Sequence, residues 1–115
     1  MRRFKRPEPK EAELTRAVRD MLKSLKIFHF KHWAGPMTSP KGISDILGCY
    51  KGRMIAIELK KPGWKPPKPT SKAYKHYRHQ ADFIDAVRRA GGVAFFAQSI
   101  DDVIDGLGVR DRFLF

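Results

Sequence analysis

The sequence predicts an α/β fold in which a mixed four-stranded β-sheet is flanked by helices. Three observations favour this class. Apolar residues recur at helical spacing in two separate segments, a two-residue turn signal joins two strand-like runs, and a further strand-like run follows the second helical segment. The expected order along the chain is helix, three strands, helix, strand and helix.

The first helix is expected over residues 10–26, because its apolar side chains recur every three or four positions. Residues 27–33 alternate in polarity and are rich in aromatic side chains, which is typical of a strand. Residues 1–9 are basic and contain two prolines. We therefore expect a flexible basic arm over residues 1–9 and a single domain over residues 10–115.

A β-hairpin is expected after a loop at residues 34–42. Residues 43–50 and 53–60 are both strand-like, and Lys51-Gly52 between them is a plausible two-residue turn. The hairpin would therefore connect two strands of the sheet directly.

This turn would also fix the register of the hairpin. It sets Tyr50 opposite Arg53, and counting back five residues along each strand brings Asp45 opposite Glu58. Directly opposed residues share a face of the sheet, with Cβ atoms roughly 4.5 to 5.5 Å apart. Two carboxylates in this arrangement can hold one metal cation between them.

Alternation along the second hairpin strand predicts two different faces. The face expected to carry the chemistry holds Met54, Ala56, Glu58 and Lys60. The face expected to pack in the core holds Ile55, Ile57 and Leu59. Cys49 lies opposite Met54 in this register and is predicted to be a small core residue.

The second half of the chain begins with a segment that is unsuited to regular structure. Residues 62–71 contain four prolines among lysines, which predicts a basic loop beside the proposed site. A second helix is expected over residues 75–90, ended by Gly91-Gly92. The remaining elements are a short buried strand over residues 93–97 and a last helix over residues 100–107, capped by Ser99.

The charge balance predicts a polyanionic partner. Lys and Arg number 24 against 12 Asp and Glu, and the pI is near 10.2. Such a charge suits nucleic acid, an anionic membrane or an RNA-bound structural protein equally well. No apolar run approaches the roughly 20 residues that span a bilayer, and the basic N-terminus lacks the apolar core of a secretory signal. We expect a cytoplasmic or nucleoid-associated protein.

Cys49 is the only cysteine of the chain. An internal disulfide is therefore excluded, and so is a cysteine-based zinc cluster within one chain.

Three motifs in order resemble the PD-(D/E)xK nuclease superfamily. They are Gly-Ile-Ser-Asp at residues 42–45, Ile-Glu-Leu-Lys-Lys-Pro-Gly at residues 57–63, and Gln80 on the helix before Gly91-Gly92. Within that superfamily the chain is most similar to virus-type replication-repair nuclease (VRR-NUC) domains, which occur alone in phages and fused in repair enzymes. The resemblance covers nearly the whole chain and implies a restriction-endonuclease-like core.

The resemblance implies a role for each motif residue. Asp45 and Glu58 would bind Mg²⁺, for which Mn²⁺ can substitute. Lys60 would orient or activate the attacking water, and Gln80 would touch water or a phosphate oxygen. Ser44 is a mild departure from the proline or similar residue that the family usually has before the aspartate, and it does not affect the ligands.

In this family a glutamate on the first helix completes the metal site. Glu11 precedes Leu14 by three positions and Val18 by seven, so it belongs to the stripe that faces the sheet. Glu13 lies nearer the flank of the helix and is the alternate. The backbone carbonyl of Leu59 is a further candidate ligand.

The chemistry requires these residue types whatever the family. A phosphodiester repels nucleophiles, so a divalent cation held by hard carboxylate oxygens is suited to neutralise its charge and generate hydroxide. Taken alone, Glu-Leu-Lys on a strand also fits an exposed sheet face, and Asp45 alone fits a turn. Their shared register, the basic loop and the glutamine helix together favour the nuclease interpretation.

Basic residues crowd the segment after the second hairpin strand and predict contacts with phosphates. The nucleic-acid-binding candidates are Lys61, Lys65, Lys68, Lys72, Lys75 and Arg78. Aromatic side chains are interleaved with them, namely Trp64, Tyr74 and Tyr77. These rings could stack on splayed bases or anchor the loop onto the domain, and the sequence leaves both open.

The predicted function is divalent-metal-dependent endonuclease action on DNA. Because stand-alone relatives are similar to Holliday-junction resolvases and form dimers, the resemblance favours branched DNA, a homodimer and a phage-encoded protein in the host cytoplasm. Alternatives are a nuclease for flaps, nicks or duplex, and a non-catalytic DNA-binding module of the same fold.

Overall fold

The computed structural model describes residues 9–33 and 41–113. Its elements in chain order are α1 (Pro9–Ser24), β1 (Phe28–Lys31), β2 (Ile46–Tyr50), β3 (Arg53–Leu59), α2 (Tyr74–Arg89), β4 (Val93–Ala97), α3 (Ile100–Leu107) and the 3-10 helix η1 (Arg110–Phe113). The predicted α/β class and element order are confirmed, and η1 is an addition. Nearly all of the predicted basic arm and most of the predicted loop at residues 34–42 lie outside the described residues.

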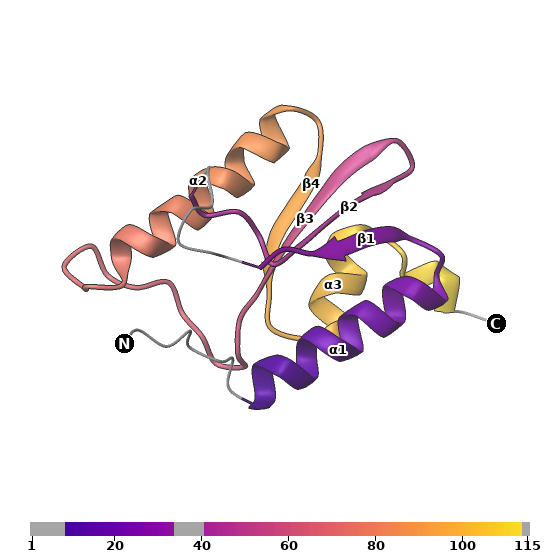
Figure 1. Ribbon diagram of the computed structural model, residues 1–115, viewed down its shortest axis with the longest axis horizontal. Helices are drawn as coiled ribbons and strands as arrows, with labels where there is room; N and C mark the ends of the chain where they lie inside the picture. Colours follow the sequence, from indigo (N-terminus) through magenta and orange to yellow (C-terminus); the bar gives the residue numbers. More distant parts are fainter. Residues whose placement is uncertain (1–8, 34–40, 114–115) are drawn as a thin grey trace.

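The four strands form one mixed sheet in the order β1-β2-β3-β4 (Figure 1). The first three are antiparallel neighbours, whereas β3 and β4 run parallel. Tyr50 lies opposite Arg53, so the predicted hairpin register is confirmed. Lys51 and Gly52 have φ values of 52° and 77°, and a type I′ turn requires positive φ at both central residues.

β2 begins at Ile46, three residues later than predicted. The reason lies at Gly42, whose φ is +78° and which passes directly against the backbone of α2. A Cβ atom at this position would lie 2.2 Å from the carbonyl oxygen of His79. Only glycine therefore fits, and the residues after it lead from α2 to the start of β2.

Helices cover both faces of the sheet, with α1 and α3 on one side and α2 on the other (Figure 1). The α1 and α3 side holds the larger aliphatic core, which includes Ile55, Ile57 and Leu59 as predicted. The α2 side holds a smaller core formed by Ala56, Ile84, Val87 and Ala94.

Two predictions about burial are wrong. The face of β3 expected to carry only chemistry is partly core, because α2 packs over Ala56. Cys49 pairs with Met54 as predicted but is exposed, because that end of the sheet reaches beyond the apolar stripe of α2. Met54 itself is 44% exposed. The polar side chain of this face that is buried lies at its Glu58 end.

Both predicted helix ends are confirmed. Gly91 has φ +93° and donates its N–H to Arg88, while Gly92 donates to Val87, which is the Schellman arrangement at the end of α2. Ser99 accepts a hydrogen bond from the backbone of Asp102 and caps α3. Among the helices in the described ranges, none combines the length and apolar content needed to cross a membrane.

Candidate active site

Asp45 lies at the start of β2, where the hairpin strands begin to pair. Its Oδ2 accepts a 2.9 Å hydrogen bond from the backbone N–H of Leu59. Its backbone carbonyl oxygen accepts a 2.7 Å hydrogen bond from the backbone N–H of His32. Lys31 Nζ lies 3.9 Å from its Oδ1. The Asp45 side chain is therefore held at the end of the β2–β3 pair. Continuing the register by one residue from the pair Ile46 and Ile57 places Asp45 opposite Glu58.

Glu58 is the buried acid of the site and is 4% exposed. Its Oε2 lies 3.9 Å from Lys60 Nζ, whereas its Oε1 is buried with no hydrogen-bond partner. Burial and then the negative charge of Asp45 raise the pKa of Glu58 to about 9, against the opposing charges of Lys60 and Lys31. A protonated Glu58 can also hydrogen-bond to Asp45, which favours the protonated form.

Lys60 is held in place from several directions. Its Nζ donates a 2.9 Å hydrogen bond to Gln80 Oε1 on α2, and lies 5.2 Å from the ring centre of Trp64. Its backbone N–H donates to the carbonyl oxygen of Ala97 on β4. Strand, loop and helix together thus fix the position of this ammonium group beside Glu58.

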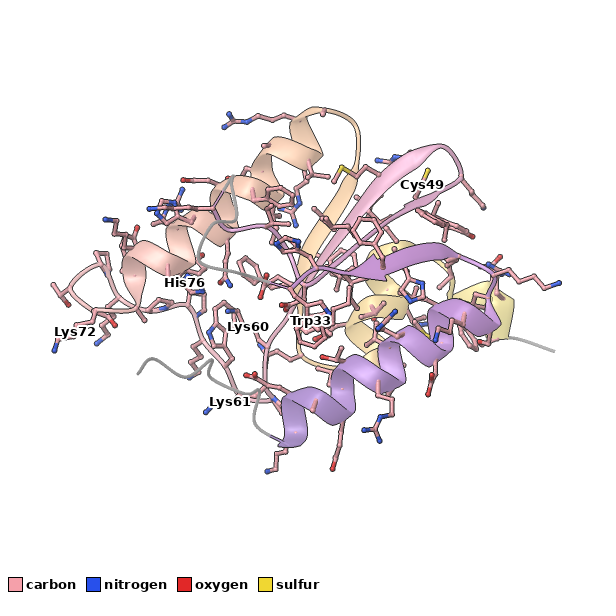
Figure 2. The ribbon with its side chains drawn as sticks, in the orientation of Figure 1. Trp33, Cys49, Lys60, Lys61, Lys72 and His76 are labelled. Carbon is pink, nitrogen blue, oxygen red and sulfur yellow. The ribbon has the colours of Figure 1, made fainter. Side chains whose placement is uncertain are left out.

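Gln80 and His76, four residues apart on α2, form a pair next to Lys60. Gln80 is 6% exposed, and its Nε2 lies 3.3 Å from Nε2 of His76. Partial burial, followed by the charge of Lys60, lowers the pKa of His76, which favours the neutral ring, the form that can accept a hydrogen bond. Figure 2 shows Lys60 and His76 at the same end of the sheet, with Cys49 at the opposite end of the hairpin.

The donor set fits a small hard cation with two protein carboxylates. Mg²⁺ commonly takes one or two carboxylates and keeps several waters, and the partnerless Oε1 of Glu58 is an oxygen that such an ion would satisfy. Among the described residues no group of three His, Cys, Asp or Glu side chains is close enough to hold a metal. The structure therefore does not bring Glu11 or Glu13 to the two acids as a third ligand.

The remaining predicted ligands have defined places. Glu11 is half-buried in the first turn of α1, and Glu13 is exposed, which is the expected order of burial. Leu59 contributes its N–H to Asp45, and its side chain packs in the larger core. A role for its carbonyl oxygen stays a prediction.

Most of the predicted nucleic-acid-binding residues are exposed on the loop and the start of α2. These are Lys61, Lys65, Lys68, Lys72 and Lys75. Figure 2 shows Lys61 and Lys72 pointing outward on the side where Lys60 lies. Arg78 differs, because its guanidinium forms an ion pair with Asp82 that raises its pKa and partly neutralises its charge.

Two of the aromatic residues, Trp64 of the loop and Tyr77 of α2, anchor this region to the sheet. Trp64 stacks on Phe96 of β4 at 5.2 Å between ring centres, and Tyr77 stacks on Phe96 at 5.7 Å. Gln98 reinforces this contact, since it accepts from the N–H of Gly63 and donates to the carbonyl oxygen of Trp64. Of the two roles that the sequence left open, the structure supports anchoring.

Sequence reasoning missed two residues that contact the site. His76 carried a local signal, because it precedes Gln80 by four positions and so shares its helix face. Lys31 had no such local signal, because its approach to Asp45 depends on the pairing of β1 with β2.

No protein-family model, curated protein or solved structure matches the chain. The similarity to VRR-NUC domains rests on the motif residues and stays a prediction.

Proposed function

We propose that this chain is a Mg²⁺-dependent endodeoxyribonuclease in which Asp45 and Glu58 hold the metal and Lys60 positions the nucleophile. One observation carries the proposal: Glu58 is 4% exposed, its Oε1 has no partner, and Asp45 lies beside it. A buried carboxylate next to a second one is unfavourable unless a proton or a cation compensates. An apolar pair would serve stability better, so the arrangement favours a functional role.

Proton and cation would compete for the same place. With a pKa near 9, Glu58 carries a proton near pH 7 when no metal is bound. Two lysines offset part of the negative charge, but each lies 3.9 Å from its carboxylate oxygen, beyond hydrogen-bonding distance. A divalent cation bound by both acids would replace the proton and satisfy the free oxygen.

The residues around the acids supply the remaining requirements of phosphodiester hydrolysis. Mg²⁺, when bound, would neutralise charge on the scissile phosphate and acidify water. Lys60 places a positive charge beside that position, and its hydrogen bond to Gln80 fixes the ammonium group. His76 in turn orients the Gln80 amide. The group is organised before substrate binds, which is what electrostatic catalysis requires.

The basic loop would hold the DNA backbone near these acids. Trp64 fixes the loop to β4, so its exposed lysines project from an anchored segment next to Lys60. Lysine contacts to phosphates bind DNA without reading its sequence. The resemblance to VRR-NUC domains favours branched DNA as the substrate and a homodimer as the assembly.

The direct test is cleavage of labelled four-way junctions, flaps, nicked duplex and plain duplex, with Mg²⁺, Mn²⁺ or EDTA. We expect cleavage only with a divalent metal. Asp45→Asn and Glu58→Gln should each reduce the rate at least about 100-fold, since each removes part of a charge clamp worth several kcal/mol.

Asp111→Asn is the matched control, because it removes one carboxylate charge from an exposed position in η1. It should cut like the unaltered chain. Persistent cleavage in EDTA, or by Asp45→Asn, would refute the proposed site. Binding of all these DNAs without any cutting would identify a non-catalytic DNA-binding module.

A further inference from the structure

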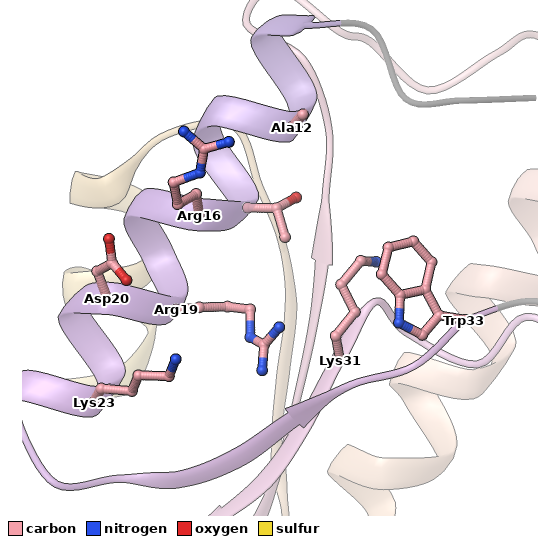
Figure 3. A pocket seen from close by; sticks show the side chains of 8 residues that line it. Ala12, Arg16, Arg19, Asp20, Lys23, Lys31 and Trp33 are labelled. Carbon is pink, nitrogen blue, oxygen red and sulfur yellow. The ribbon is translucent and has the colours of Figure 1, made fainter.

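A second basic region lies next to α1 and β1, on the opposite side of the sheet from α2. A groove of about 350 Å³ runs between α1 and β1 (Figure 3). The residues that give it chemical character are Arg16, Arg19, Lys23, Asp20, Lys31 and Trp33. Four cations thus face a single carboxylate. None of these cations belongs to the basic loop that the sequence singled out.

The cations of the groove are incompletely satisfied. Arg19 extends from α1 toward β1 (Figure 3), and its Nε is buried with no hydrogen-bond partner. Within residues 9–33 and 41–113, neither Arg16 nor Lys23 forms an ion pair. A buried donor without an acceptor is unfavourable, and an anion in the groove would supply one.

Trp33 gives the groove an aromatic wall. Its side chain is 69% exposed, and Lys31 Nζ lies 4.4 Å from the ring centre. Unlike Trp64, which stacks on Phe96, this indole has no ring partner in the described part of the chain. A cationic groove beside an exposed indole, of which Lys31 covers only one face, is the combination that binds unpaired nucleic-acid strands.

Lys31 connects the groove to the two acids. It lines the groove, and its Nζ lies 3.9 Å from Asp45 Oδ1. A strand whose scissile phosphate lay at Asp45 and Glu58 would therefore place a neighbouring phosphate beside Lys31, at the entrance to the groove.

We propose that this groove binds the unpaired nucleotide that flanks the scissile phosphate. Arg16, Arg19 and Lys31 contact its phosphate, and its base stacks on Trp33. A volume near 350 Å³ is at the small end of ligand sites and suits one nucleotide rather than a duplex. The inference rests on the proposed nuclease function and narrows its substrates to DNA with a single-stranded segment at the cut.

The test is binding of a fluorescein-labelled single-stranded oligonucleotide in EDTA, followed by anisotropy over a range of salt concentrations. Trp33→Ala should weaken binding about 5- to 100-fold with an unchanged salt dependence, because a stacking contact is lost and no charge. Arg19→Ala should weaken binding and reduce the salt slope by about 0.7, the contribution of one phosphate contact on a single strand.

Arg89→Ala is the matched control, since it removes one exposed arginine at the end of α2, away from α1 (Figure 1). If Trp33→Ala and Arg19→Ala bind the oligonucleotide within twofold of this control, the groove proposal is overturned. It is also overturned if blunt duplex loses as much affinity as the single strand, or if polyglutamate competes as well as the oligonucleotide does.

Cleavage assays separate the two proposals. If no DNA is cut with Mg²⁺ but the groove variants still lose single-strand affinity, the nuclease function fails and the groove stands as a binding site. If cleavage depends on Asp45 while the groove variants bind normally, the nuclease stands and the groove fails.

Discussion

The two faces of β3 are buried to a similar extent, yet they differ in what their buried atoms contact. On the side of α1 and α3, Ile55 and Ile57 are fully buried among other aliphatic side chains. On the side of α2, Ala56 is fully buried and Glu58 is 4% exposed, with one oxygen unsatisfied. Burial alone therefore does not separate core from site. In β3, the carboxylate oxygen of Glu58 that has no partner makes the difference.

The largest expected effect contrasts adjacent residues on the two faces. Ile57→Ala should lower the free energy of unfolding by about 2–5 kcal/mol, because it leaves a cavity in the larger core. Glu58→Gln in EDTA at pH 8 should be no less stable than the unaltered chain, since it removes a buried acid without a full set of partners. Urea unfolding of both variants measures the difference. Equal losses would mean that Glu58 is an ordinary structural residue.

The second prediction concerns pH in the absence of metal. The ordinary pKa of Glu58 is 4.5, and in the folded chain it is raised to about 9. Between these values the folded state keeps a proton that the unfolded state has lost, so stability should fall as pH rises through this window. Thermal unfolding in EDTA from pH 5 to pH 9 measures this slope.

Two controls sharpen the pH experiment. Glu58→Gln should show a flatter pH profile, because its side chain does not titrate. Adding Mg²⁺ at pH 8 should stabilise the unaltered chain more than Glu58→Gln, since an ion that binds only the folded state adds stability. A profile that rises with pH in the unaltered chain, or equal metal effects in both, would contradict the assignment.

A smaller loss is expected at the contact between the site and α2. Gly42→Ala should lower the free energy of unfolding by more than about 1 kcal/mol, because φ is +78° and the added Cβ would meet the backbone of His79. The shift should also move Asp45 relative to Gln80 and reduce cleavage. Gly63→Ala is the control, since its φ is +85° but its Cβ would meet no atom within 4 Å. Similar losses in both variants would exclude the packing contact as the cause.

The smallest effect is expected at Ser44, which is fully buried with an unpartnered hydroxyl. Ser44→Ala should raise the free energy of unfolding by up to about 1 kcal/mol, because no hydrogen bond is lost and a buried hydroxyl without a partner is removed. Urea unfolding tests this. A loss above about 1 kcal/mol would show that the hydroxyl has a partner in solution.

The sequence predicted best where the determining signal is local. The Lys51-Gly52 turn alone sets the hairpin register, and Gly91-Gly92 and Ser99 mark helix ends through their own backbone bonding. The approach of Asp45 to Glu58 follows from that register, so this part of the candidate site was predictable before any tertiary structure was known.

Contacts that depend on how separate elements meet were not predictable in the same way. Lys31 reaches Asp45 through the pairing of β1 with β2, and these two strands are separated in the sequence by residues 32–45, so no two-residue turn motif predicts their register. The exposure of Cys49 depends on how much of the sheet α2 covers, whereas strand alternation shows only which residues share a face.

The parallel pairing of β3 with β4 has a consequence for the stage of folding at which the proposed activity could arise. The backbone N–H of Lys60 donates a hydrogen bond to the carbonyl oxygen of Ala97 in β4. The helix that carries Gln80, α2, lies between β3 and β4 in the sequence. We therefore expect the lysine to reach its working position only after the last strand has docked. Folding intermediates that contain only the hairpin would be inactive. The proposed hydrolysis would therefore begin only when the whole fold has formed.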